Sequence, residues 1–271
     1  MKVHLVGVGG NGAQMVGCLA RLDIALRATG HPHGLFVAAF DGDAVSESNV
    51  GRQLFFPPDV GQNKAAVMVQ RTNLAYGIDW AARPWNYRDE DLEGGKPDIL
   101  ISCVDTRSTR RKLHKLLFSG RSNTRYWLDL GNTEATGQVV LGVPKPPTLS
   151  ARKTRLPCVT ELFPDLLDAG VPDDNAPSCS VKVSLESQGL FVNDVAVRFG
   201  AQLIYELFRG KLSEHGVLLN LNSKRTAPIP IDPAVWRRFG FMGDEAERRK
   251  GRGRARSGTS HIEVEAERLA A

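Results

Sequence analysis

The feature that most constrains the fold is the N-terminal segment VHLVGVGGNG, residues 3–12, in which an apolar run ends in a glycine-rich turn. The run predicts a buried strand over residues 3–6. Apolar side chains at helical spacing follow the turn, at Met15, Val16, Leu19, Leu22 and Leu26. A second apolar strand is expected over residues 35–40. Strand, glycine turn, helix and strand in this order are typical of a βαβ unit.

Strands and helices continue to alternate through most of the chain. Hydrophobic periodicity predicts helices over 63–76, 106–119 and 181–210, and strands over 98–105, 125–130, 137–143, 216–222 and 227–231. Such alternation favours an α/β fold: a Rossmann-like, doubly wound, mostly parallel sheet with a long crossover loop and late antiparallel strands.

Composition divides the chain into four parts. Residues 1–143 would form a nucleotide-binding half, and the proline-rich residues 144–178 a crossover loop. Residues 179–240 would complete the same domain. A basic tail, 241–271, is expected to be disordered. Residues 237–256 hold eight Arg or Lys against three acidic residues, so they account for the formal net charge of +5. Because no aromatic residues interleave these charges, we favour a solvated tail over nucleic-acid contact.

Composition also narrows the class of protein. The chain has 271 residues, of which 42% are hydrophobic and 24% charged, as in ordinary globular domains. No apolar run is long enough to span a membrane, and the first strand leaves no room for a signal peptide. The four cysteines form no CxxC pair, which fits a reducing cytoplasm.

Two features of the first βαβ unit predict a nucleotide site. Glycines between a strand and a helix let the backbone approach a phosphate at the helix N-terminus, and here they are Gly7, Gly9, Gly10 and Gly12. Asp41 ends the second strand, where a carboxylate can accept hydrogen bonds from ribose hydroxyls. An NAD-dependent Rossmann oxidoreductase would account for both features and remains an alternative.

The stretch FDGDAVSESNVGRQLFF, residues 40–56, favours a triphosphate over a dinucleotide. A triphosphate needs several cationic and amide donors, and the chain supplies Ser48, Asn49, Arg52, Gln53 and, at the start of the next helix, Lys64. Asp105, followed by Thr106, ends the next buried strand and would face the same crevice. A carboxylate at that point can hold Mg²⁺ against the phosphates.

The motifs GVGGNG, DGDAVSESNVGRQ, VGQNK and SCVDT resemble those of the ThiF/MoeB/HesA family, bacterial relatives of ubiquitin-activating enzymes, over residues 1–222. The resemblance implies that Asp41 holds the ribose, that Asn49, Arg52 and Lys64 hold the phosphates, and that Asp105 holds magnesium. It implies ATP-dependent adenylation of the C-terminal carboxylate of a small ubiquitin-like (β-grasp) protein, with release of pyrophosphate. The nearest subgroup is the ThiF-type protein of the PRTRC cassette.

The chain departs from the family pattern in several places. Many relatives bind structural zinc through two CxxC pairs, but here Glu161 stands where a partner for Cys158 would fall, so we expect no structural zinc. The chain also lacks the N-terminal helix that lends an arginine to the partner subunit, which weakens the expectation of a homodimer. A nucleotide-binding scaffold without transfer activity is therefore a further alternative.

Cys179 stands just before the long C-terminal helix. Some members of the family carry a cysteine there that becomes linked to the carrier protein. A thiol at a helix N-terminus can have a lowered pKa and act as a nucleophile. An unreactive loop cysteine is the alternative.

Overall fold

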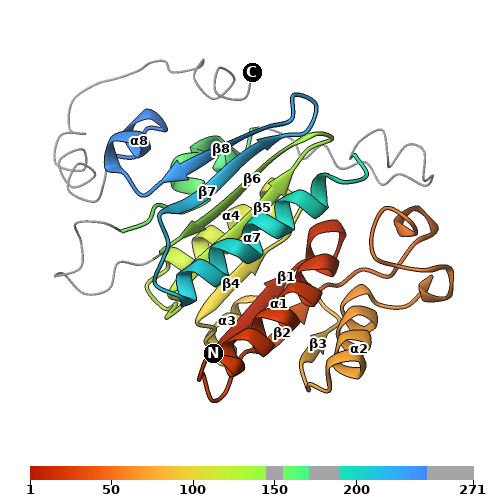
Figure 1. The fold of residues 1–271 in the computed structure, drawn as a ribbon. Helices are drawn as coiled ribbons and strands as arrows, with labels where there is room; N and C mark the ends of the chain where they lie inside the picture. Colours follow the sequence, from red (N-terminus) through yellow and green to blue (C-terminus); the bar gives the residue numbers. More distant parts are fainter. Residues whose placement is uncertain (145–154, 171–188, 243–271) are drawn as a thin grey trace.

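One eight-stranded sheet runs through the protein (Figure 1). The computed structural model describes residues 1–144, 155–170 and 189–242. The strand order is β3-β2-β1-β4-β5-β6-β7-β8. The first five strands in this order are parallel and the last three pairings are antiparallel. The strands are β1 (Lys2–Val6), β2 (Phe36–Phe40), β3 (Ala81–Arg83), β4 (Ile99–Ser102), β5 (Tyr126–Asn132), β6 (Thr136–Gly142), β7 (Glu214–Asn220) and β8 (Arg225–Pro230).

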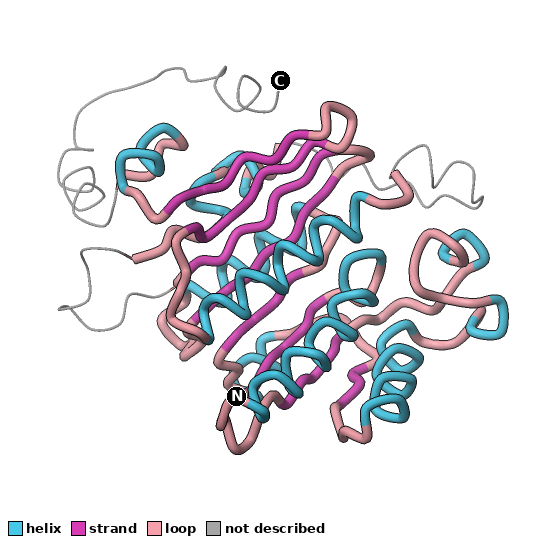
Figure 2. The backbone as a smooth tube through the Cα atoms, viewed as in Figure 1, coloured by secondary structure: helices cyan, strands magenta, loops and turns pink. Residues whose placement is uncertain are grey.

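Helices cover both faces of the sheet, and each face has its own hydrophobic core. On one face lie α1 (Gly10–Ala28), α2 (Lys64–Tyr76) and α7 (Val192–Phe208), with α1 beside α7 (Figures 1 and 2). The second core contains side chains of α3 (Asp89–Gly95), α4 (Arg107–Phe118), α5 (Val159–Leu162) and α8 (Pro233–Arg238). No helix in the described ranges is long and apolar enough to cross a bilayer.

The central strands are rich in apolar residues, as is usual for strands buried on both faces of a sheet. Along β4, Ile99 and Ile101 pack into the first core and Leu100 packs into the second. This alternation follows from the period of two along a strand. The α/β class, the parallel centre and the late antiparallel strands expected from the sequence are confirmed.

Several elements differ from the sequence prediction. The short strand β3 and the polar helix α3, in which Leu92 is buried, were not expected. The helix predicted over 181–210 begins at Val192, and residues 181–188 lie outside the described part. Just before it, the amide of Gly189 bonds to the Glu134 carbonyl at 2.7 Å. A Cβ at Gly189 would lie 2.4 Å from that oxygen, so a side chain at this position would prevent the close approach of the chain to Glu134.

The described part of the proline-rich segment, residues 155–170, is ordered against α4. It forms α5 and the 3₁₀ turn η4 (Pro164–Leu167). Arg107 and Arg111 of α4 donate hydrogen bonds to the carbonyls of Asp165 and Asp168. The sequence shows no hydrophobic periodicity here, because contacts with α4, and not a regular apolar face, hold these turns in place. The rest of the predicted crossover loop, and the tail beyond Met242, lie outside the described residues.

Two buried histidines are expected to make the fold sensitive to acid. Burial lowers the pKa of His4 in β1 and of His215 in β7 to about 4. The unfolded chain therefore binds protons from about pH 6.5 downward while the folded chain does not. Each histidine should destabilise the fold by up to about 3 kcal/mol as the pH falls from 6.5 to 4.

Urea unfolding at pH 7.5, 5.5 and 4.5 measures this effect. His4→Gln and His215→Gln should each show a smaller loss of unfolding free energy on acidification than the unsubstituted protein, whatever their stability at pH 7.5. His33→Gln, at an exposed loop position, is the matched control. An unchanged pH dependence in the double variant would contradict the assignment.

Candidate functional site

A deep cavity opens at the carboxyl ends of the parallel strands. On one side of β1 the sheet continues through β2 to β3, and on the other side through β4 to β5. The strand order therefore reverses between β1 and β4, which flank the topological switch point of the sheet. Ligands of open α/β sheets bind at such a point. The cavity has a volume of about 1040 Å³, at the upper end of the range for small-molecule sites.

The glycine-rich turn forms the floor of the cavity. Gly7 has a φ of 86°, and a Cβ there would lie 2.7 Å from the carbonyl oxygen of Cys103. A Cβ on Gly12 would lie 1.9 Å from the Gly7 carbonyl oxygen. Only glycine fits at these two positions. Gly9 and Gly10 line the cavity at the start of α1, where free backbone N–H groups attract anions.

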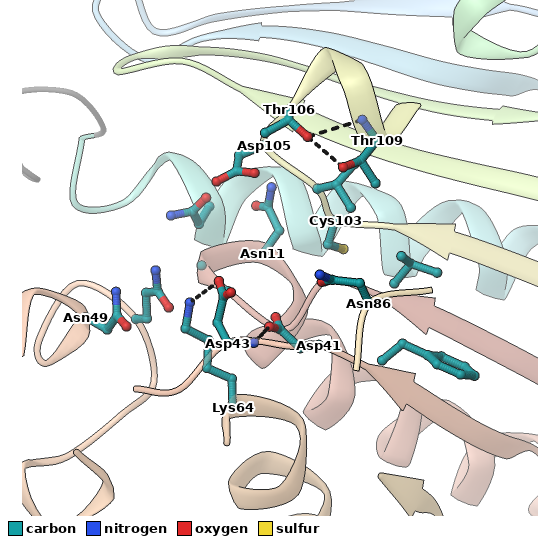
Figure 3. Close-up of a pocket in the computed structure, with 18 of the residues that line it drawn as sticks. Asn11, Asp41, Asp43, Asn49, Lys64, Asn86, Cys103, Asp105, Thr106 and Thr109 are labelled. Carbon is teal, nitrogen blue, oxygen red and sulfur yellow. Dashed lines mark hydrogen bonds and ion pairs between the residues drawn. The ribbon is translucent and has the colours of Figure 1, made fainter. Parts of the chain in front are cut away.

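Asp41 links the end of β2 to the glycine turn. Its carboxylate accepts hydrogen bonds from the backbone N–H groups of Val8 at 2.6 Å and Asp43 at 2.8 Å. Burial raises the pKa of Asp41, and these two hydrogen bonds oppose the shift. The carboxylate lines the cavity (Figure 3), and each oxygen retains a lone pair that a ribose hydroxyl can use.

The polar loop after Asp41 is held in shape by its own side chains. The Asn49 side-chain oxygen accepts from the Ser46 backbone N–H at 3.0 Å, and the Ser48 hydroxyl pairs with that of Ser46 at 2.9 Å. Ser48, Asn49 and Gln53 are buried and, with Arg52, line the cavity. The loop therefore has a fixed shape and presents amide and guanidinium groups to the cavity.

Lys64 reaches the same cavity from the first turn of α2. Asn63 caps this helix and donates to the carbonyls of Asp41 and Asp43, which fixes α2 against the loop. The Lys64 ammonium is buried and pairs with the Asp43 carboxylate at 3.2 Å (Figure 3). Because the Asp43 side chain is 71% exposed, solvent screens this pair and a bound anion can compete for the lysine.

Asp105 lies at the opposite side of the cavity, after β4. Asp105 is exposed and lines the cavity, as does Arg52. Burial lowers the pKa of Arg52, and Asp105 opposes this shift. Thr106 also lines the cavity, but its hydroxyl caps α4 through Thr109, so its main role in the structure is to start that helix.

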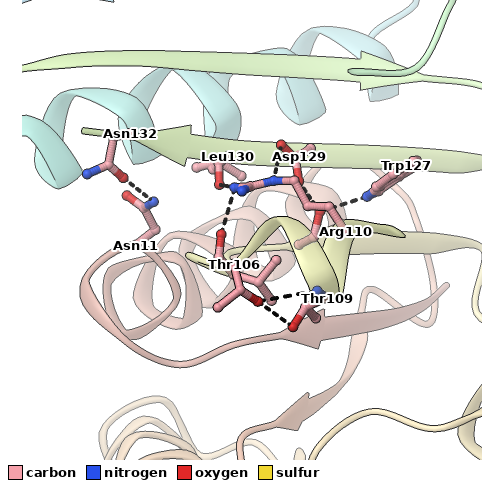
Figure 4. A network of polar contacts seen from close by, with 10 residues as sticks. Asn11, Thr106, Thr109, Arg110, Trp127, Asp129, Leu130 and Asn132 are labelled. Carbon is pink, nitrogen blue, oxygen red and sulfur yellow. Dashed lines mark hydrogen bonds and ion pairs between the residues drawn. The ribbon is translucent and has the colours of Figure 1, made fainter. Parts of the chain in front are cut away.

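A buried polar network supports the loop that carries Asp105 (Figure 4). Arg110 of α4 pairs with Asp129 of β5 at 3.1 Å, with side-chain exposures of 5% and 0%. The same guanidinium donates to the carbonyl of Val104 at 2.6 Å. Ser102 donates to Asp129 and receives a hydrogen bond from Trp127. The network fixes the carbonyl next to Asp105 and thereby the start of its loop.

The structure brings the expected residues together and adds others. Gly7, Gly9, Gly10, Asp41, Ser48, Asn49, Arg52, Gln53, Lys64, Asp105 and Thr106 line the cavity, whereas Gly12 does not line it and packs in α1 against the Gly7 carbonyl. Asn11, Asn86, Tyr87, Asn132 and Asn193 also line it but were not expected. Polar residues in otherwise apolar helices, as in GGNGAQMV and FVNDVAV, were the available signal. Cys179 lies outside the described residues, so its proposed role stays a prediction.

The site and the fold define an α/β protein with a nucleotide-binding type of cavity at the switch point of the sheet. A sequence profile of the ThiF family matches residues 1–225, and the chain belongs to the ThiF family. A search of curated proteins found no significant match.

Solved structures share the fold. A crystal structure of PaaA superposes with a TM-score of 0.54 at 18% identity, covering 85% of this chain and 64% of that one. Escherichia coli MccB with ATP gives a TM-score of 0.56 at 16% identity, covering 85% and 63%. The Microcin C7 biosynthetic enzyme MccB with N-formylated MccA gives 0.57 at 15% identity, covering 85% and 64%. This chain thus matches less than two thirds of the length of these proteins.

Proposed function

We propose that this protein uses ATP to adenylate the C-terminal carboxylate of a small ubiquitin-like (β-grasp) protein and releases pyrophosphate. The observation that carries the proposal is the convergence, in one cavity, of the α1 N-terminus, Arg52, Lys64 and Asp105. Two cations facing a helix N-terminus suit a triphosphate. The match to the ThiF family and the MccB structure solved with ATP support the same conclusion.

The reaction follows from the placement of these groups. Asp41 would hold the ribose, and Asn49, Arg52 and Lys64 would hold the phosphate chain. One carboxylate oxygen of the substrate protein attacks the α-phosphorus, and the bond to the bridging oxygen of the β-phosphate breaks. Pyrophosphate carries away the bonding electrons, and an acyl-adenylate remains. Positioning and neutralisation of charge supply most of the rate enhancement in such transfers.

Asp105 fits a role in holding Mg²⁺. Within residues 1–144, 155–170 and 189–242, no three His, Cys, Asp or Glu side chains gather as a metal site. Mg²⁺ usually needs only one or two protein carboxylates, because phosphate oxygens and water complete its octahedron. Bound there, Mg²⁺ would neutralise charge on the phosphates. Asp105, exposed in the cavity, is the side chain that would hold it.

ATP–pyrophosphate exchange tests the proposal. Exchange should require both Mg²⁺ and a small β-grasp partner protein. ATP binding without partner-dependent exchange would favour the scaffold. Tight NAD binding with no response to ATP would favour the oxidoreductase. A cysteine-linked carrier at Cys179 and a homodimer are further proposals, which mass spectrometry and solution scattering can test.

We expect loss of either cation to weaken the use of ATP. Lys64→Met and Arg52→Gln should each lower kcat/KM for ATP about tenfold or more, because a hydrogen bond to a charged group is worth about 1.5–3 kcal/mol. Steady-state exchange at varied ATP concentration measures the effect. Lys211→Met, at an exposed position after α7, should change nothing. Unaltered ATP kinetics in both cavity variants would remove the phosphate assignment.

A further inference from the structure

Three asparagines in the cavity have no part in the chemistry described above. Asn11 lies in the first turn of α1, Asn132 ends β5 and Asn193 lies in the first turn of α7. All three line the cavity. Asn11 is 7% exposed and Asn193 is 2% exposed. Buried amides normally have hydrogen-bond partners, so an unpartnered amide atom of a cavity residue is available to bind a ligand.

The hydrogen bonds of Asn11 fix which atom it offers. The Asn132 amide nitrogen donates to the Thr133 carbonyl at 3.2 Å, so its Oδ1 is an acceptor. That oxygen accepts from Nδ2 of Asn11 at 2.7 Å (Figure 4). Oδ1 of Asn11 is therefore left as an acceptor, and it is buried without a partner among the described residues. Oδ1 of Asn11 can therefore accept a hydrogen bond from an N–H or O–H group.

Asn193 offers a donor in the same cavity. Its Nδ2 is buried and also has no partner in the described part of the chain. The amide fills the space over Gly10, where a Cβ would lie 2.5 Å from Nδ2. The adjacent Asp194 accepts from Gln14 of α1 at 3.0 Å, which anchors the start of α7 to α1. The position of Asn193 is thus set before any ligand arrives.

ATP is poorly suited to this pair. A triphosphate carries acceptors only, so it cannot satisfy Oδ1 of Asn11. The ribose hydroxyls, and the adenine whose amino group is the other hydrogen-bond donor of ATP, belong near Asp41 at the end of β2, whereas Asn132, the partner of Asn11, lies on β5, on the opposite side of β1 in the sheet. A peptide unit, by contrast, offers one N–H and one C=O. An acceptor and a donor in one cavity match the two hydrogen-bonding groups of a peptide unit.

We propose that Asn11 and Asn193 bind the main chain of the substrate protein's C-terminal tail. Oδ1 of Asn11 accepts from a peptide N–H, and Nδ2 of Asn193 donates to a peptide carbonyl. These contacts hold the terminal carboxylate in line with the α-phosphate. The two residues bind only main-chain groups of the substrate and position it, and they take no part in proton or electron transfer. The proposal rests on the adenylation activity proposed above and specifies how that site binds its protein substrate.

Exchange kinetics on the full chain test this proposal. Asn11→Leu and Asn193→Leu should raise KM for the β-grasp protein about tenfold, while KM for ATP stays within about twofold because the phosphate contacts are untouched. Asn222→Leu, in the exposed β7–β8 turn, is the matched control. A rise in KM for ATP with no change for the partner protein would overturn the proposal.

A second measurement needs no change in the enzyme. Synthetic peptides copying the last eight residues of the partner would carry a single ester in place of each peptide bond in turn, which removes one N–H. One ester position should raise the peptide's KM about tenfold with the unsubstituted enzyme and have no further effect with Asn11→Leu. Equal use of all esters would overturn the proposal. Failure of the proposed function is distinguishable, since neither partner nor peptide would then support exchange.

Discussion

Replacing Asp105 with asparagine should reduce partner-dependent ATP–pyrophosphate exchange about a hundredfold or more. The amide keeps the size of the side chain but removes the negative charge that would hold Mg²⁺ against the phosphates. The fold should be unaffected, because the carboxylate is exposed in the cavity. Exchange rates at saturating ATP and partner, together with an unfolding curve, measure both parts of this expectation.

A control variant distinguishes the loss of negative charge at Asp105 from the loss of one negative charge anywhere on the protein. Asp79→Asn removes the same charge at an exposed position outside the cavity and should leave exchange unchanged. Raising the Mg²⁺ concentration should partly restore Asp105→Asn if the defect lies in metal affinity. Normal turnover of Asp105→Asn at low Mg²⁺ would refute the metal role of this residue.

Asp129→Ala should destabilise the fold by about 3–5 kcal/mol, since it leaves the Arg110 guanidinium buried without its counter-charge. The ion pair has side-chain exposures of only 5% and 0%, so water cannot replace the lost partner. Ser102 loses its acceptor as well. Denaturant unfolding measures the loss, and reduced exchange should accompany it because Arg110 also holds the Val104 carbonyl.

Two comparisons make this stability prediction specific. The double variant Arg110→Met/Asp129→Leu should recover much of the loss, because an apolar pair of similar volume can replace a buried ion pair at little cost. Glu93→Ala breaks the exposed pair with Arg121, whose side chains are 47% and 69% exposed, and should cost under about 1 kcal/mol. A loss of similar size in Glu93→Ala and Asp129→Ala would contradict the explanation.

An ion pair supports the start of α5. Arg155 pairs with Glu161 through both carboxylate oxygens, at 2.8 and 2.6 Å. Glu161 also accepts from the backbone N–H of Cys158. Burial raises the pKa of the Cys158 thiol. The ion pair and the hydrogen bond together hold the start of α5.

Local sequence was sufficient to predict the first βαβ unit and eleven of the 25 residues that line the cavity. The spacing of apolar residues determines which segments become buried strands, and parallel strands end at the same edge of a sheet. Glycines between strand and helix, and polar residues at Asp41, Lys64 and Asp105, therefore indicated one site before any contact was known. The short β3 and α3 were missed because each has too few apolar residues to show a period.

Only the tertiary structure decided which distant residues meet in the cavity. Asn11 and Asn132 are 121 positions apart and Gln14 and Asp194 are 180 apart, and no local pattern links them. Their contacts depend on the strand order, which puts β4 beside β1 and β5 beside β4, and on the packing of α7 against α1. The sequence by itself determined the elements and the charges at their ends, because those follow from local spacing. The pairing of Arg110 with Asp129, and the unpartnered amides of Asn11 and Asn193, arise only when elements from both halves of the chain are packed together.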